Sequence, residues 1–147
     1  MLAARLPVRS IAASVARRSA RVPVRSPVAT RAMNTIAPGV EFDTVAREWR
    51  MKWSADNDKA SLAEVQKHLT HVQGALGKVP GVKSVQRVVC GGCLDYKVVI
   101  ALDAAKFGDW EAAKFAPEEK FLNAVKSIPG VTNVETQTYT LMAVDTK

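Results

Sequence analysis

The chain has 147 residues, 48% of them hydrophobic and 24% charged, and its formal net charge is +7. This composition is that of an ordinary folded domain and excludes a fibrous or disordered chain. Residues 1–33 contain seven arginines and no acidic residue, so residues 34–147 carry 14 basic and 14 acidic residues. A domain without net charge has no basic surplus for nucleic acid, and we expect no nucleic-acid partner.

Residues 1–33 have the features of an organellar transit peptide. They are rich in Arg, Ala, Val and Ser, and arginines interrupt every apolar stretch that a secretory signal would need. The alternative is a disordered basic tail that binds nucleic acid. Three prolines and the end of the segment, Val28–Met33, are typical of a chloroplast leader cleaved near Ala32. We expect import into the chloroplast stroma, with the mitochondrial matrix as the alternative.

The first part of the domain is predicted to be a strand followed by a helix. A polar linker (residues 34–43) comes first. The residues then alternate, which predicts a strand with one buried face: one side carries Val45, Arg47, Trp49, Met51 and Trp53, and the other carries Ala46, Glu48, Arg50 and Lys52. Ser61 and Glu64 form the pattern of a capping box, and Gly77 is expected to end the helix in a left-handed conformation. The apolar stripe of this helix consists of Leu62, Val65, Leu69, Val72 and Leu76.

The second part begins with two β-rich runs around Gly91-Gly92, a glycine pair that predicts a tight two-residue hairpin. Residues 103–116 are expected to be irregular. A helix then begins at Pro117 and ends at Pro129-Gly130, and a last strand follows. One face of the second β-rich run collects Leu94, Tyr96, Val98, Ile100 and Leu102.

An internal repeat supports this order of elements. Val79–Val85 and Ile128–Val134 both read x-Pro-Gly-Val-x-x-Val, 49 residues apart. The β-α-β-β-α-β order predicts an α+β ferredoxin-like sandwich over residues 44–144, with a four-stranded antiparallel sheet, two helices on one face, and a tail at 145–147. Because Trp49 or Trp53 could make the open face apolar, we expect a homodimer that packs sheet against sheet. No apolar run approaches the roughly 20 residues of a membrane-spanning helix.

The segment Pro80-Gly81-Val82…Gly92-Cys93-Leu94-Asp95-Tyr96 resembles the effector-binding (RAM) domain of leucine-responsive/AsnC regulators, and Pro129–Thr136 is similar to its closing strand. The resemblance covers residues 79–142. More broadly, the pattern is similar to the dimeric α/β-barrel superfamily, which includes small monooxygenases. The resemblance implies a dimer or higher oligomer with a small ligand near the Gly92–Tyr96 hairpin. Gly92, Asp95 and Tyr96 are therefore candidate ligand-binding residues, and Tyr139 is expected to line the same cavity.

Cys90-Gly91-Gly92-Cys93 is the most specific local motif. It permits two free thiols, a redox-switched disulfide or half of a metal site, and the chain has no further cysteine to complete a four-cysteine site. His68 and His71 have a spacing that could serve a metal or heme, but they lack a third ligand. Solvent-facing histidines are the simpler interpretation, and we predict no metal site.

Two hypotheses follow. The first is a non-catalytic organellar module that works as a dimer, binds a small ligand or docks on a larger organellar complex, and responds to redox state through its CGGC hairpin. The alternative is a small dimeric α/β-barrel enzyme of oxygenase or isomerase type, with an apolar pocket that contains His68, Trp49 or Tyr96. Trp49 is also a candidate for core or interface packing. Because no nucleophile–base pair or phosphate loop is evident, the first hypothesis is favoured, without a cofactor.

Overall fold

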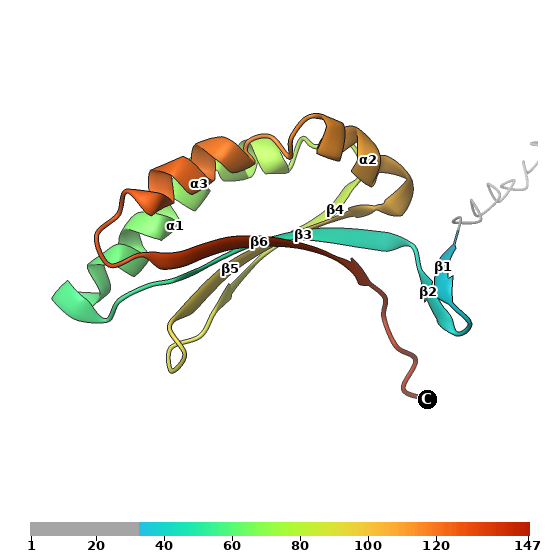
Figure 1. Ribbon diagram of the computed structural model, residues 1–147, viewed down its shortest axis with the longest axis horizontal. Coiled ribbons are helices and arrows are strands. Elements are labelled where there is room, and N and C mark those ends of the chain that lie inside the picture. Colours follow the sequence, from blue (N-terminus) through green and yellow to red (C-terminus); the bar gives the residue numbers. More distant parts are fainter. Residues whose placement is uncertain (1–32) are drawn as a thin grey trace, which may run out of the picture.

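The computed structural model describes residues 33–147, so the expected transit peptide lies outside the described residues except for Met33. These residues form the predicted ferredoxin-like sandwich, with the strand order β4-β5-β3-β6 in an antiparallel sheet (Figure 1). The strands are β3 (Thr44–Lys52), β4 (Val82–Val89), β5 (Asp95–Asp103) and β6 (Thr132–Leu141), and the helices are α1 (Asp56–Leu76), α2 (Ala104–Ala112) and α3 (Glu118–Lys126). None of the helices in residues 33–147 is long and apolar enough to cross a membrane.

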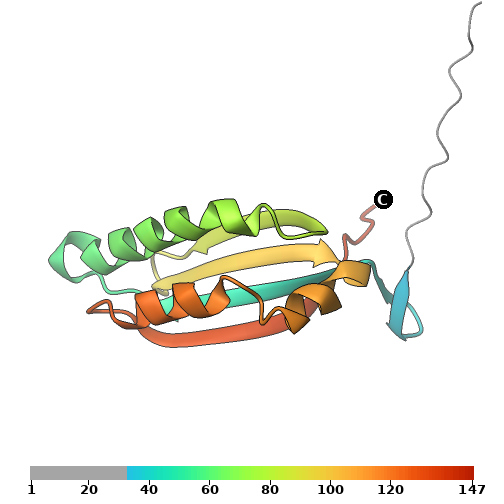
Figure 2. The same ribbon diagram turned by 90° about the horizontal axis from the view of Figure 1, so that it is seen from above.

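The core lies between the sheet and the helices. Helix α1 runs along the β4–β5 side of the sheet and α3 along the β3–β6 side (Figure 2). The β3–β5 register pairs Trp49 with Val98 and Met51 with Tyr96, so the alternating apolar residues of both strands share the helix-covered face. Trp49 and Trp53 are 0% and 4% exposed in this core, and the idea that they form the open face is therefore wrong.

No helix of residues 33–147 covers the opposite face of the sheet (Figure 1). Its residues alternate with those of the core, and they include Glu48, Val99 and Tyr139. Glu48 is only 6% exposed, and its Oε2 accepts a hydrogen bond of 2.8 Å from the Tyr139 hydroxyl. A charged side chain at this depth is tolerated because it has a hydrogen-bond partner.

The repeated Pro-Gly-Val motif leads from a helix into a strand in both halves. Gly81 and Gly130 have φ values of +84° and +90°, a region that L side chains rarely adopt. A Cβ at Gly81 would lie 2.5 Å from the Cβ of Lys106, and a Cβ at Gly130 would lie 3.1 Å from the Cβ of Ser54. The two glycines are thus required by both the backbone conformation and the close approach of a neighbouring segment.

The capping box predicted at the start of α1 does not form, although the right-handed part of the helix begins only after Lys59. Ser61 lies inside the helix, where its hydroxyl accepts from the Ser54 N–H at 2.9 Å and donates to the Ser54 carbonyl at 3.2 Å. Glu64 pairs with Lys67 instead of closing the box. Gly77 ends the helix with a right-handed φ of −65°, so the left-handed cap is also wrong.

Three further segments differ from the expected pattern. Residues 34–42, expected as a linker, contain a two-stranded hairpin of β1 (Asn34–Ala37) and β2 (Val40–Phe42). Residues 103–116 are not irregular throughout, because α2 begins after Asp103, whose side chain accepts from the Ala105 N–H at 3.0 Å. The residues Asn57–Lys59 at the start of α1 adopt left-handed φ values between 51° and 61°.

Candidate functional site

The candidate site is a hollow of about 420 Å³ between α1 and the strands β4 and β5. Apolar walls come from Leu62 and Ala63 on the helix and from Val89 on β4. The β4–β5 register places Val89 opposite Tyr96 and Arg87 opposite Val98, on the helix-covered face. The complete lining is Asp58, Lys59, Leu62, Ala63, Gln66, Arg87, Val89 and Tyr96.

Three polar side chains converge in this hollow. The amide oxygen of Gln66 accepts hydrogen bonds from the Tyr96 hydroxyl at 2.9 Å and from Arg87 Nη1 at 2.7 Å. Gln66 Nε2 donates to the Thr70 hydroxyl at 3.4 Å, which fixes the orientation of the amide. Gln66 therefore positions both donors, one from each strand.

Tyr96 is a hydrogen-bond donor at neutral pH. Burial raises its pKa to about 12, and the nearby charge of Arg87 opposes this shift without cancelling it. The side chain is completely buried, so the neutral phenol is strongly favoured over the phenolate. In chemical terms, the hollow offers a bound ligand the N–H donors of Arg87 that Gln66 leaves free, while the single O–H of Tyr96 is engaged by Gln66.

The hollow continues along α1 into a second one of about 460 Å³. The two share Gln66 and Arg87, and the second adds Leu69 from the helix and Val85 from β4. Together they form one groove between α1 and the edge strand β4, with Arg87 near its middle. We call this the α1–β4 groove.

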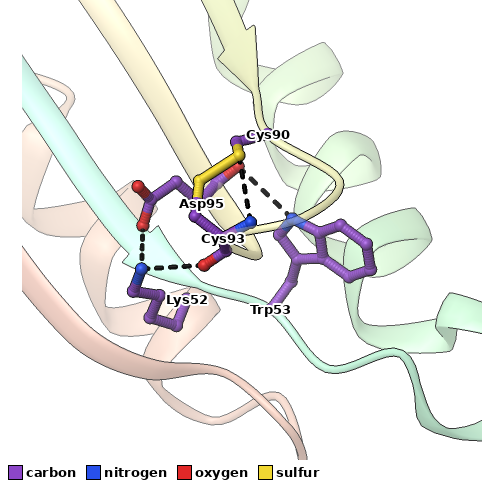
Figure 3. The surroundings of a disulfide bond; sticks show 5 residues. All are labelled: Lys52, Trp53, Cys90, Cys93 and Asp95. Atoms are coloured by element: carbon purple, nitrogen blue, oxygen red, sulfur yellow. Dashed lines mark hydrogen bonds and ion pairs between the residues drawn. A yellow bond between two sulfur atoms is a disulfide. The ribbon is translucent and has the colours of Figure 1, made fainter.

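A disulfide between Cys90 and Cys93 closes the loop at one end of the groove (Figure 3). The connection spans residues 90–94 and is longer than the predicted two-residue turn. The Cys93 N–H donates to Cys90 Sγ at 3.1 Å, and the Cys90 N–H donates to the Asp95 carbonyl at 2.9 Å. Of the three alternatives for this motif, the structure contains the disulfide. The loop adjoins Val89 and Tyr96, which line the hollow.

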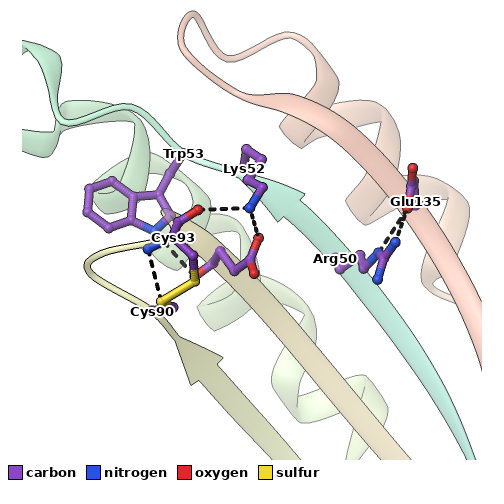
Figure 4. Close-up of polar contacts among 7 residues, drawn as sticks. Arg50, Lys52, Trp53, Cys90, Cys93 and Glu135 are labelled. Carbon is purple, nitrogen blue, oxygen red and sulfur yellow. Dashed lines mark hydrogen bonds and ion pairs between the residues drawn. A yellow bond between two sulfur atoms is a disulfide. The ribbon is translucent and has the colours of Figure 1, made fainter.

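The remaining ligand-binding candidates do not gather around Tyr96. The Asp95 carboxylate forms an ion pair with Lys52, whose hydrogen bond lowers the pKa of Asp95 (Figure 3). Figure 4 shows a second ion pair of the same strand, between Arg50 and Glu135. Tyr139 lies on the open face, where burial and its bond to Glu48 raise its pKa to about 12. Asp95 and Tyr139 therefore do not share a cavity with Tyr96 in one protomer, and Gly92 is an exposed loop residue.

Two of the three catalytic candidates also lie elsewhere. The Trp49 indole donates to Glu118 Oε2 at 2.7 Å and stacks on Phe121 in the core. His68 and His71 face each other on α1 with ring centroids 6.2 Å apart, and neither lines the hollow. Within residues 33–147 there is no group of three or more side chains that could hold a metal ion. Tyr96 is the candidate that the structure places in the site.

Sequence reasoning missed Gln66 and Arg87. A neutral glutamine on a helix and an arginine on a strand are common surface residues, so neither one is a signal by itself. Gln66 does lie one helical turn after Leu62, and Arg87 and Val89 alternate on the strand that leads to the CGGC motif. These spacings, combined with the β4–β5 register, would have brought them beside Tyr96.

Comparisons with solved structures support the fold at low sequence identity. The monooxygenase from the gene ActVA-Orf6 of Streptomyces coelicolor, solved with nanaomycin D, has a TM-score of 0.55 at 14% identity, over 72% of this chain and 93% of that one. A protein assigned as an antibiotic biosynthesis monooxygenase from Deinococcus radiodurans has a TM-score of 0.54 at 15% identity, over 70% of this chain and 97% of that one. The cofactor-independent oxygenase SnoaB from Streptomyces nogalater has a TM-score of 0.51 at 14% identity, over 71% of this chain and 99% of that one. No known family profile and no curated protein sequence matches the chain.

These neighbours correct the functional expectation. The prediction of a non-catalytic module is wrong, because the proteins of similar fold are oxygenases, and the enzyme alternative is the better one. At this identity the likeness itself shows the fold alone. The resemblance to the effector-binding domain of transcriptional regulators gains no support from these structures.

The expectation of no cofactor is contradicted as well. The heme degrader MhuD from Mycobacterium tuberculosis, solved with two hemes in its active site, is among the neighbours, with a TM-score of 0.47 at 17% identity over 69% of this chain and 98% of that one. That TM-score is too low to assign heme to this chain. The hollow between α1 and the sheet is lined by no histidine, so the described residues do not offer the usual heme ligand there.

Proposed function

We propose that the protein is a small enzyme of oxygenase type whose substrate binds in the hollow between α1 and the strands β4 and β5. The observation that carries this proposal is the convergence of Tyr96 and Arg87 on Gln66 beside the apolar walls of the hollow. Apolar walls with a few converging polar groups are typical of small-molecule sites. The oxygenase names of proteins with a similar fold support the type of reaction.

The site suits a substrate in which a carbonyl oxygen becomes negative. Loss of a proton from an activated CH₂ group would give an enolate, whose oxygen the Arg87 guanidinium would stabilise as a donor. The Tyr96 hydroxyl, which donates to Gln66, would hold the amide that orients Arg87. Asp58, the carboxylate that lines the hollow, would accept the proton. The overall reaction, CH₂ + O₂ → C=O + H₂O, is balanced because the substrate supplies all the electrons.

Oxygen uptake with anthrone, a tricyclic compound with an activated CH₂ group, tests this proposal. We expect the enzyme to take up one molecule of O₂ for each molecule of anthrone oxidised, as the balanced reaction requires. Tyr96→Phe should lower kcat/KM by about 10-fold because it removes one of the two hydrogen bonds to the Gln66 amide that orients Arg87. Tyr139→Phe makes the same chemical change on the open face and should leave the rate unchanged. Uptake no faster than the uncatalysed oxidation of anthrone would overturn the proposal.

Three expectations from the sequence belong to this proposal. The open face of the sheet supports a homodimer that packs sheet against sheet, and the Cys90–Cys93 disulfide supports a response to redox state. The arginine-rich residues 1–33 support import into the chloroplast stroma, or into the mitochondrial matrix as the alternative. A fluorescent protein fused behind residues 1–33 should enter one of these organelles, and a cytosolic signal would contradict the import.

A further inference from the structure

Arg87 stands in the α1–β4 groove without a carboxylate partner. Its Nη1 donates to the neutral amide of Gln66, and none of the ion pairs in residues 33–147 includes Arg87. A guanidinium has five N–H donors, and the Gln66 bond uses one of them. The side chain is exposed where the two hollows meet, so the remaining donors are accessible to a ligand.

The other half of the domain also holds a guanidinium, that of Arg47, in the equivalent part of the sheet. The repeat relates residues 49 apart, and the strand registers obey it: Val89 pairs with Tyr96 as Thr138 pairs with Arg47. By this relation Tyr96 corresponds to Arg47, and Arg87 corresponds to Thr136. The position under α1 is therefore equivalent to a position under α3.

Under α3 a guanidinium is neutralised by the chain itself. Arg47 binds both carboxylate oxygens of Glu118, with Nε at 2.7 Å and Nη2 at 2.8 Å, and it also donates to the hydroxyls of Thr136 and Thr138 at 3.0 Å. The side chains of Arg47 and Glu118 are only 15% and 12% exposed. Two parallel bonds of this kind are the strongest way to pair a guanidinium with a carboxylate.

From this contrast we infer that the ligand of the α1–β4 groove is an apolar carboxylate, whose carboxylate binds Arg87 as Glu118 binds Arg47. The apolar part of the ligand lies against Leu62 and Val89 in one hollow, or against Leu69 and Val85 in the other. Asp58 and Lys59 also line the first hollow and carry opposite charges, and Arg87 forms no ion pair with Asp58 or with any other carboxylate of residues 33–147. The inference rests on the proposed location of the site and names the substrate class. The four N–H donors that the Gln66 bond leaves free allow Arg87 to bind both a carboxylate and an enolate oxygen of one substrate, whereas anthrone, which has no carboxylate, tests the reaction alone.

The test compares naphthalene-2-carboxylate with naphthalene-2-carboxamide, which has nearly the same shape and no charge. We expect the full chain to bind the carboxylate about 10-fold more tightly at neutral pH and low ionic strength, as for a partly exposed charge-assisted hydrogen bond. Arg87→Gln should abolish this preference, and Arg87→Lys should keep part of it. Lys97→Gln removes a positive charge from the open face and should leave the preference intact.

Equal binding of the two probes to the wild type, or a preference that survives in Arg87→Gln, would overturn the inference. Circular dichroism of each variant shows whether a loss of binding reflects unfolding. The result is separable from the proposed reaction: a carboxylate preference without oxygen uptake keeps the ligand class and removes the oxygenase. Oxygen uptake without the carboxylate preference keeps the oxygenase and removes the ligand class.

Discussion

Glu118 joins helix α3 to two side chains of strand β3 through a single carboxylate. It accepts from Arg47 on β3 and from the indole of Trp49 on the same strand, while it lies in the first turn of α3. The Arg47 guanidinium also lies 4.1 Å from the centroid of the Phe115 ring. Because a half-satisfied buried network is unfavourable, the three partners depend on one another.

We predict that Glu118→Ala lowers the free energy of unfolding by about 2–3 kcal/mol, since it leaves a buried guanidinium and a buried indole N–H without their acceptor. Glu119→Ala removes the neighbouring, exposed carboxylate from the same helical turn and should cost less than about 0.5 kcal/mol. Urea denaturation followed by circular dichroism measures both. Equal effects of the two substitutions would show that Glu118 contributes only as a helix N-terminal charge.

The two tyrosines predict a loss of stability in alkaline solution. Tyr96 and Tyr139 both have their pKa raised from 10.0 to about 12, in each case mainly by burial. Above pH 10 the unfolded chain releases its phenolic protons while the folded chain keeps them, so the free energy of unfolding falls as the pH rises toward 12. Below pH 10 this contribution is fully present.

Urea midpoints measured at pH 9 and pH 11.5 check this prediction. The wild type should lose stability between these values, and a Tyr96→Phe/Tyr139→Phe double variant should lose less, because phenylalanine has no proton to release. Lysine titration affects both proteins alike. An identical decrease in both proteins would count against the raised pKa values.

At the scale of elements, the loop between β4 and β5 is held by its own disulfide and by residues at the end of β3. Its disulfide joins residues three apart, and β3 binds it through Lys52 Nζ, which donates to the Cys93 carbonyl at 2.8 Å. The backbone N–H of Trp53, the residue after β3, donates to the Leu94 carbonyl at 2.9 Å. The end of β3 and the loop therefore form one unit next to Tyr96.

Reduction of the Cys90–Cys93 disulfide should lower the free energy of unfolding by about 1–2 kcal/mol, the amount expected from loop entropy for so short a loop. Urea midpoints with and without a phosphine reductant measure the effect. A Cys90→Ser/Cys93→Ser variant should match the reduced wild type and should not respond to the reductant. If the variant responds, the effect of the reductant lies elsewhere.

The elements that could be predicted from sequence are those whose side chains repeat at a fixed period. The stripe of α1 and the alternating faces of β3 and β5 are confirmed, since burial of one face imposes that period. Helix ends were less predictable. Ser61 and Glu64 have the spacing of a capping box, yet tertiary contact with Ser54 engages Ser61 instead. Helix α2 was missed because its buried residues, Phe107 and Trp110, are too few to establish a period.

At the scale of the whole molecule, the open face of the sheet determines the proposed assembly. Val99 lies near its middle, paired with Glu48 on β3 and Gln86 on β4. We predict that Val99→Arg weakens the homodimer by more than about 100-fold, because each copy would bury an unpaired charge. Sedimentation velocity measures the mass of the wild type and of each variant. The matched control is Val144→Arg, because the Val144 side chain lies beyond β6 and is 82% exposed. A monomeric wild type, or a dimer in both variants, would contradict this assembly.

The candidate site depends on the whole molecule more than on any motif. Tyr96 could be predicted because it belongs to a buried alternating strand, but Gln66 and Arg87 reach it from two other elements. Their convergence requires the β4–β5 register and the placement of α1 over it, which no local pattern encodes. The CGGC motif was enough to predict the loop. The grouping of Gln66, Arg87 and Tyr96 beside it follows only from the three-dimensional arrangement of the elements.

The position of Trp53 gives the protein an optical reporter of its own. Its indole N–H donates to the Asp95 carbonyl at 3.3 Å, whereas the indoles of Trp49 and Trp110 bond to Glu118 and to the Ala116 carbonyl, away from the cross-linked loop. Of the three tryptophans, all within residues 33–147, Trp53 is thus the one whose emission should follow opening of the loop. Intrinsic fluorescence can therefore follow the thiol–disulfide state in solution without any added label.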